Sequence, residues 1–122
     1  MALKPSHYDL EVWKEAMRLT RDVFDATQQM PESERFGLQS QIRRSAVSVP
    51  SNIAEGAGRG TSAELKRFLR IARGSLTELD TQLWIAADLK WIERTNEIAE
   101  RLESVFRLIN GLLKSNRKHG RV

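Results

Sequence analysis

Hydrophobic residues recur every three or four positions along most of the chain, which is the spacing of one face of an α-helix. This pattern predicts four helices, at about residues 10–29, 37–55, 62–89 and 95–114. The third is the most regular, because its apolar residues from Leu65 to Ala86 follow a seven-residue repeat. Long amphipathic helices joined by short connections are typical of an up-down four-helix bundle, so we expect an all-α fold. The length of 122 residues is that of one domain, and residues 115–122 are expected to form a basic C-terminal tail.

The second predicted helix carries two stripes of residues instead of one. Its apolar stripe, from Leu38 to Ile53, is the expected core face. Beside it runs a stripe in which every side chain is polar: Gln41, Ser45, Ser48, Asn52 and Glu55. Because buried polar groups need hydrogen-bond partners, we expect this stripe to meet another helix closely, either within the subunit or between subunits.

Pro50 lies inside this second helix and cannot donate a hydrogen bond to the carbonyl of Ala46. The apolar pattern continues across it, from Val49 to Ile53. This continuity favours one helix with a kink at the proline over a break into two helices.

Three closely spaced glycines, at positions 56, 58 and 60, are expected to end the second helix and form the next turn. Their spacing invites comparison with a nucleotide-binding loop. The comparison fails because a helix precedes them, and because no lysine stands before Thr61 and Ser62. A weaker anion site at the start of the third helix, beside Arg59, is an alternative. Thr61 and Glu64 have the spacing of a capping box that would begin this helix.

The composition argues against several kinds of chemistry. The chain has no cysteine, which excludes disulfides and thiolate metal sites, and no apolar run approaches the ~18 residues of a membrane span. We therefore expect a cytoplasmic protein. His7 and His119 are the only histidines and neither has a partner at metal-ligand spacing, so we expect no metal and no cofactor. Without a histidine near a serine, no catalytic triad is predicted, and we expect no enzyme. Glu55 and Glu78 could be an acid–base pair, but the plainer interpretation ties each to an arginine such as Arg44 or to a serine.

Positive charge is concentrated in the second half of the chain. Residues 1–60 contain eight basic and eight acidic side chains, whereas residues 61–122 contain twelve and eight, which accounts for the net charge of +4. One basic group lies in and before the tail, at Lys114, Arg117, Lys118 and Arg121. Because such clusters attract polyanions, we select six candidate nucleic-acid-binding residues: Arg43, Arg59, Lys66, Arg67, Arg70 and Arg73. The plainer interpretation of the same residues is a solvated helix face with a frayed tail.

Two segments carry a family resemblance: QIRRSAVSVPSNIAEGAGR and, on the next helix, RFLRIARGSLTELDTQLWIA. They resemble the four-helix-bundle proteins encoded by intervening sequences in bacterial 23S rRNA genes. This family is also labelled an S23-type ribosomal protein family. The likeness extends from Leu10 through the fourth helix. Its most specific residues include an expected structural polar network: Arg44, Ser48, Asn52, Glu55, Ser75 and Glu78. The resemblance implies an up-down bundle in a homopentameric ring. The chain is also similar to the accessory bundle protein of diversity-generating retroelements, a positively charged pentamer implicated in binding nucleic acid and a reverse transcriptase.

Our leading hypothesis is a cytoplasmic, non-enzymatic, oligomeric bundle that binds RNA or another nucleic acid through phosphate contacts. The alternative is a protein–protein interaction scaffold with no nucleic-acid role. In that case Trp84 and the apolar arc of the first helix, which covers roughly 200° where a core face needs ~100°, would contact other subunits or a partner. A third class, an enzyme acting through Glu55 or Glu78, would need an open polar cavity beside these carboxylates.

Overall fold

The computed structural model describes residues 6–115, and these form an all-α fold. The bounds of the helices are η1 Ser6–Asp9, α1 Glu11–Thr27, η2 Glu32–Glu34, α2 Leu38–Gly58, α3 Ser62–Asp88 and α4 Asn96–Lys114, where η marks a short 3-10 helix. No strand occurs in this part of the chain, and none of its helices is both long and apolar enough to cross a membrane. The predictions for His119 and for the tail beyond Ser115 lie outside the described residues.

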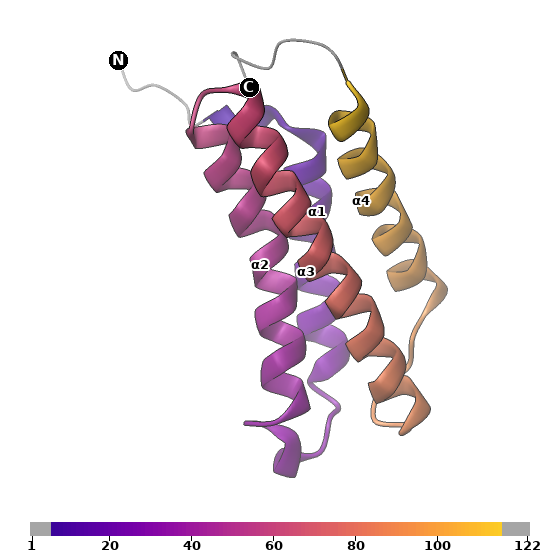
Figure 1. The fold of residues 1–122 in the computed structure, drawn as a ribbon. Helices are drawn as coiled ribbons and strands as arrows, with labels where there is room; N and C mark the ends of the chain where they lie inside the picture. The colour runs from indigo at the N-terminus through magenta and orange to yellow at the C-terminus, as the bar shows by residue number, and fades with distance from the viewer. Residues whose placement is uncertain (1–5, 116–122) are drawn as a thin grey trace.

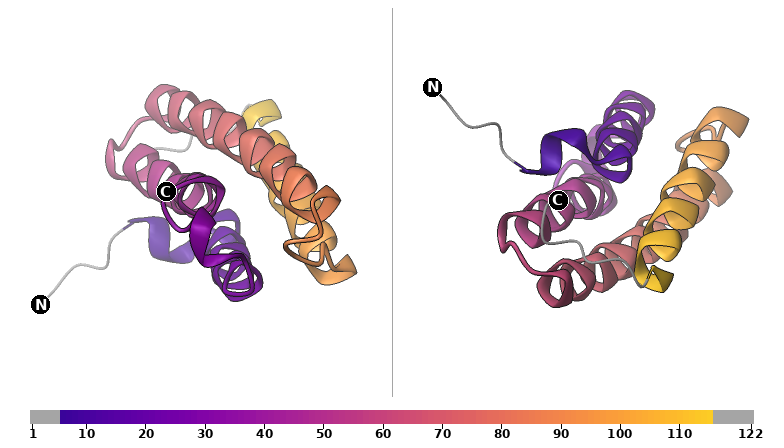
Figure 2. Two further views of the ribbon diagram at one scale, coloured as in Figure 1. Left: turned by 90° about the horizontal axis from the view of Figure 1, so that it is seen from below. Right: turned by 90° about the horizontal axis from the view of Figure 1, so that it is seen from above.

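The predicted four-helix bundle is confirmed. Each long helix packs against the next one in the chain, and α1 also packs against α4, which closes the bundle (Figure 1). Seen end-on, the helices follow one another around the bundle in chain order (Figure 2). All four contribute to one hydrophobic core, in which Leu19, Ile42, Leu76 and Ile109 are almost completely buried.

The most extensive contact in the bundle is that between α2 and α3, and Gly56 lies in it. The expected end of α2 near Glu55 was wrong, because the helix continues through Gly56 to Gly58. A Cβ atom at Gly56 would lie 2.7 Å from the Cβ of Phe68 and 3.3 Å from the backbone of Leu65. Gly56 is therefore a site of close helix approach and does not end the helix. Gly60 alone of the three glycines has a left-handed backbone, with φ of 81°.

The N-terminal caps of α3 and α4 are formed by threonines, and the capping box predicted for α3 is only half present. The side chain of Thr61 accepts a hydrogen bond from the backbone N–H of Glu64, and Thr95 caps α4 in the same way through the N–H of Ile98. The second half of the predicted capping box was wrong. The Glu64 carboxylate turns to Arg59 and Arg67 instead, at 3.5 and 3.7 Å.

Pro50 lies within a single continuous α2, as the apolar pattern predicted, and the kink stays a prediction. The carbonyl that Pro50 cannot satisfy, that of Ala46, lies 3.2 Å from the hydroxyl oxygen of Thr20 on α1. The same hydroxyl lies 2.8 Å from the carbonyl of Ala16, so its proton is shared between the two helices. A threonine on a neighbouring helix thus supplies the donor that the proline lacks.

We expect Thr20→Val to lower the free energy of unfolding by about 1–2 kcal/mol, because the carbonyl of Ala46 loses its donor in a half-buried position. The measurement is urea denaturation at a fixed protein concentration. Thr77→Val is the matched control, since the exposed Thr77 hydroxyl donates only to the carbonyl one turn before it, that of Arg73. Equal losses in the two variants would contradict this role for Thr20.

Candidate nucleic-acid interface

The polar stripe of α2 meets α3 within the subunit. The hydroxyls of Ser48 and Ser75 share a hydrogen bond of 2.8 Å, and Ser45 donates to a carboxylate oxygen of Glu78 at 3.2 Å. The amide of Asn52 donates to the backbone carbonyl of Ser48, one turn before it, at 2.8 Å. Small polar side chains therefore join α2 to α3 through hydrogen bonds at Ser48–Ser75 and Ser45–Glu78.

The two ends of the predicted polar network do not join this contact. Glu55 is exposed, and it accepts a hydrogen bond at 2.9 Å from Arg59, which follows it by four residues at the end of α2. This bond is the main cause that raises the pKa of the Arg59 guanidinium. Arg44 is exposed and has no hydrogen-bond or ion-pair partner among residues 6–115, so Arg44 was wrong as the example of an arginine partner. The expected tie between Glu55 and an arginine is confirmed, with Arg59 as the partner. The expected tie between Glu78 and a serine is confirmed.

An open polar hollow of about 300 Å³ lies beside this contact, bordered by Arg44, Glu78 and Gln82. The Oε1 atom of Gln82 is buried and accepts no hydrogen bond from the described residues. Glu55 does not share this hollow. Because Ser48 faces Ser75 in an antiparallel pair, ten residues of helix separate the levels of the two glutamates, or roughly 15 Å. This distance argues against the acid–base pair, which would need both carboxylates at one substrate.

Three of the six candidate nucleic-acid-binding residues keep their positive charge without a carboxylate partner. The ammonium of Lys66 donates to the backbone carbonyl of Ser115 at 2.7 Å, and Arg73 donates to the side-chain oxygen of Asn110 at 2.9 Å. Both bonds tie α3 to α4 through neutral acceptors. Arg70 lies between them on the exposed side of α3 and has no hydrogen-bond or ion-pair partner in the described part of the chain. We name these three residues the α3 basic surface.

Two other candidates lie near the α3 basic surface but are partly neutralised. Arg59 pairs with Glu55 and Glu64, and Arg67 pairs with Glu64. Both guanidinium groups also lie over the ring of Phe68, each 4.9 Å from its centroid. Their contribution to the attraction of a polyanion is therefore smaller than their formal charge suggests.

The sixth candidate, Arg43, lies apart from the others, near the opposite end of α2. Its Nε donates to the hydroxyl of Thr27 at 2.9 Å, and its Nη2 donates to the carbonyl of Phe24 at 3.2 Å. The structure therefore does not bring all six residues together. Neither the neutral partners of Lys66 and Arg73 nor the contacts of Arg43 could be found by counting charges, because each partner lies at least 16 positions away in the chain.

The chain was compared with models of protein families. The family described as 23S rRNA-intervening sequence protein matches residues 8–111, which includes most of the four long helices. The comparison with curated proteins gives no match.

Proposed function

This chain belongs to the 23S rRNA-intervening sequence protein family, and we propose that it is a non-enzymatic bundle that binds RNA or another nucleic acid through phosphate contacts. One observation carries the proposal: Lys66, Arg70 and Arg73 form a surface whose charges meet no carboxylate among residues 6–115. Lysine and arginine side chains release condensed counterions when they contact phosphates, which supplies most of nonspecific binding.

Assembly into a homopentameric ring in the cytoplasm is part of this proposal. The resemblance in the polar and glycine-containing segments of α2 and α3 supports it. A ring would repeat the α3 basic surface on every subunit. A long nucleic acid could then contact several modest sites at once, which raises the overall affinity.

We expect Arg70→Glu to weaken the binding of RNA by tenfold or more at low salt and to reduce the slope of log affinity against log salt by about one. The reason is the loss of one phosphate contact together with repulsion by the new carboxylate. Fluorescence anisotropy with a labelled RNA, titrated at several salt concentrations, measures both quantities.

Arg21→Glu is the matched control for this experiment, because Arg21 is an exposed helical arginine on α1 and the change in net charge is the same. Its affinity should stay within about twofold of the wild type if position matters more than net charge. Equal losses in the two variants would show a nonspecific charge effect. Absence of any RNA or DNA binding by the wild type at low salt would remove the proposal.

A protein-interaction scaffold is the second candidate function, and the exposed aromatic residues favour it. Trp84 is 57% exposed on α3, with the guanidinium of Arg94 stacked 4.3 Å from the centre of its ring. Arg94 is fixed in turn by Asp80 at 2.8 Å, so one ring face is covered and the rest is open to a partner. Arg70→Glu separates the candidates, since a partner seated on Trp84 would be little affected by it.

A further inference from the structure

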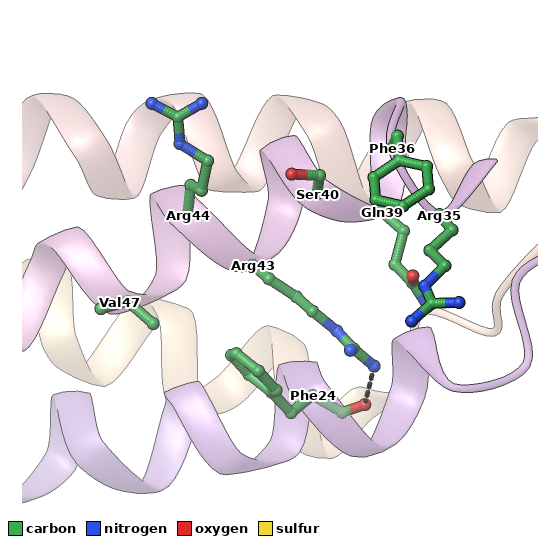
Figure 3. Close-up of a pocket in the computed structure, with 8 residues that line it drawn as sticks. All are labelled: Phe24, Arg35, Phe36, Gln39, Ser40, Arg43, Arg44 and Val47. Carbon is green, nitrogen blue, oxygen red and sulfur yellow. Dashed lines mark hydrogen bonds between the residues drawn. The ribbon is translucent and has the colours of Figure 1, made fainter.

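A shallow hollow of about 440 Å³ opens between α1 and the first half of α2, at the end of the bundle that carries η2 (Figure 3). It combines phenyl rings, an aliphatic side chain and cationic groups: Phe24, Phe36, Val47, Arg35, Arg43 and Arg44. No carboxylate lines it among the residues that the structure describes. We name it the arginine–phenylalanine hollow, and the inference is based on its phenyl rings and its arginine side chains.

Two apolar side chains of the hollow, one of them the Phe36 ring, are open to solvent to an unusual degree. Phe36 is 90% exposed and Val47 is 44% exposed, although both are apolar. The guanidinium of Arg35 lies 5.5 Å from the centre of the Phe36 ring, which leaves nearly all of that ring free. An exposed ring of this kind offers a flat apolar face to a ligand.

The inner wall of the hollow is held in place by Arg43. Its side chain crosses from α2 to α1, where it binds the carbonyl of Phe24 and lies 4.7 Å from the centre of the Phe24 ring (Figure 3). A third contact, to the hydroxyl of Thr27, fixes the guanidinium from the other side. The wall is therefore ordered by the bundle before any ligand binds, which lowers the entropic cost of binding.

The two rims of the hollow carry the available charge. Arg44 points away from Phe24 on the far side of α2 (Figure 3) and has no ion-pair partner within residues 6–115. Arg35 lies beside Phe36, and its contact with Glu32 is a solvent-exposed pair at 3.9 Å, which contributes little. An anion at either rim would therefore meet a guanidinium whose charge is nearly free.

We propose that the arginine–phenylalanine hollow binds an unpaired base of a single-stranded nucleic acid, which stacks on Phe36 while Arg35 and Arg44 contact the flanking phosphates. Stacked rings with arginines alongside are the general means by which proteins bind single strands without reading their sequence. A duplex fits poorly, because its bases already stack on one another and cannot reach the ring. This inference rests on the proposed function and adds a preference for single strands.

Three substitutions at Phe36 separate stacking from a general apolar contact. Phe36→Ala and Phe36→Leu should each weaken the binding of a labelled single-stranded oligouridine about tenfold, whereas Phe36→Tyr should bind within about twofold of the wild type. Binding of a duplex RNA should change little in all three variants. Because Phe36 is 90% exposed, none of the three changes removes a core contact. Leu89→Ala is the matched control, since Leu89 is 49% exposed at the end of α3 and lies outside the hollow.

The outcomes distinguish this inference from the function on which it rests. If Phe36→Ala weakens binding no more than Leu89→Ala, while Arg70→Glu weakens it strongly, the stacking site is wrong and the nucleic-acid function stands. If Phe36→Leu binds as well as the wild type, the contact is apolar and no base stacks there. If Phe36→Ala lowers the mass measured by light scattering without RNA, the occupant is a second copy of the chain, which also overturns the inference.

Discussion

Gly56→Ala is expected to lower the free energy of unfolding by about 3 kcal/mol, although the substitution adds a single methyl group. The new Cβ would lie 2.7 Å from the Cβ of Phe68 and 3.3 Å from the Cα and carbonyl oxygen of Leu65. These atoms belong to the backbone of α3 or stand next to it, so no side-chain rotation relieves the contact. The helices must separate instead, and overpacking of this kind typically costs 1–3 kcal/mol and occasionally more.

Gly74→Ala is the matched control for this prediction. Gly74 lies in the middle of α3, and a Cβ placed there meets nothing within 4 Å in the described structure. Alanine should therefore stabilise the protein by about 0.5–1 kcal/mol, the usual difference between the two residues inside a helix. Urea denaturation at one protein concentration measures both variants. A Gly56→Ala variant as stable as the wild type would show that α2 and α3 are not packed as closely as described.

The helices themselves follow from local patterns. The apolar repeat of α3 predicted residues 62–89, and the helix spans Ser62–Asp88. The end of α2 does not follow from such a pattern. In the sequence alone Gly56 resembles a helix terminator, yet it lies inside α2, where Leu65 and Phe68 of α3 leave no room for a Cβ atom. A glycine placed for contact and one placed for backbone conformation, such as Gly60, cannot be told apart without the neighbouring helix.

In the candidate site, too, some features could be predicted from the sequence and others could not. The stripe on α2 predicted a close polar contact, and Ser48 with Ser75 provides it. Charge counting, by contrast, could not separate Arg73, which keeps a free charge beside a neutral amide, from Arg43, whose guanidinium holds α1. Phe36 was missed for another reason. It stands in the connector before α2, outside any helical repeat, and only its exposure of 90% marks it as unusual.

Beside the hydrophobic core, the contact between α1 and α4 contains one arginine that faces three carboxylates. Arg101 on α4 lies 2.9 Å from Glu15 and 2.8 Å from Asp22, both on α1, and 3.7 Å from Glu97 on its own helix. The approach to Asp22 is close, but its angle is not that of a hydrogen bond, so this pair is electrostatic. Ser104 donates a second hydrogen bond to Glu15 at 3.1 Å.

Titration of Glu15 should make this network sensitive to acid. Burial alone would raise the pKa of Glu15, but the hydrogen bonds from Ser104 and Arg101 and the charges of Arg101 and Arg18 outweigh it, so the pKa lies below its usual value of 4.5. The unfolded chain then binds more protons than the folded chain as the pH falls below about 5. The stability that Glu15 contributes is therefore complete above the unfolded pKa and is lost as the pH falls through the folded pKa.

We expect Arg101→Met to lower the free energy of unfolding by about 2–3 kcal/mol at pH 7, because it removes the counter-charge of the partly buried Asp22 and leaves Glu15 with only the more exposed Arg18, at 3.5 Å. The difference from the wild type should shrink steadily as the pH is lowered from 5 to 3, since protonated Glu15 no longer needs the guanidinium. Arg107→Met is the matched control, an exposed arginine on the same helix with no ion-pair partner within residues 6–115. Its effect should be small and independent of pH. A loss for Arg101→Met that stays constant down to pH 3 would mean that its aliphatic packing, and not the charge network, joins α4 to α1.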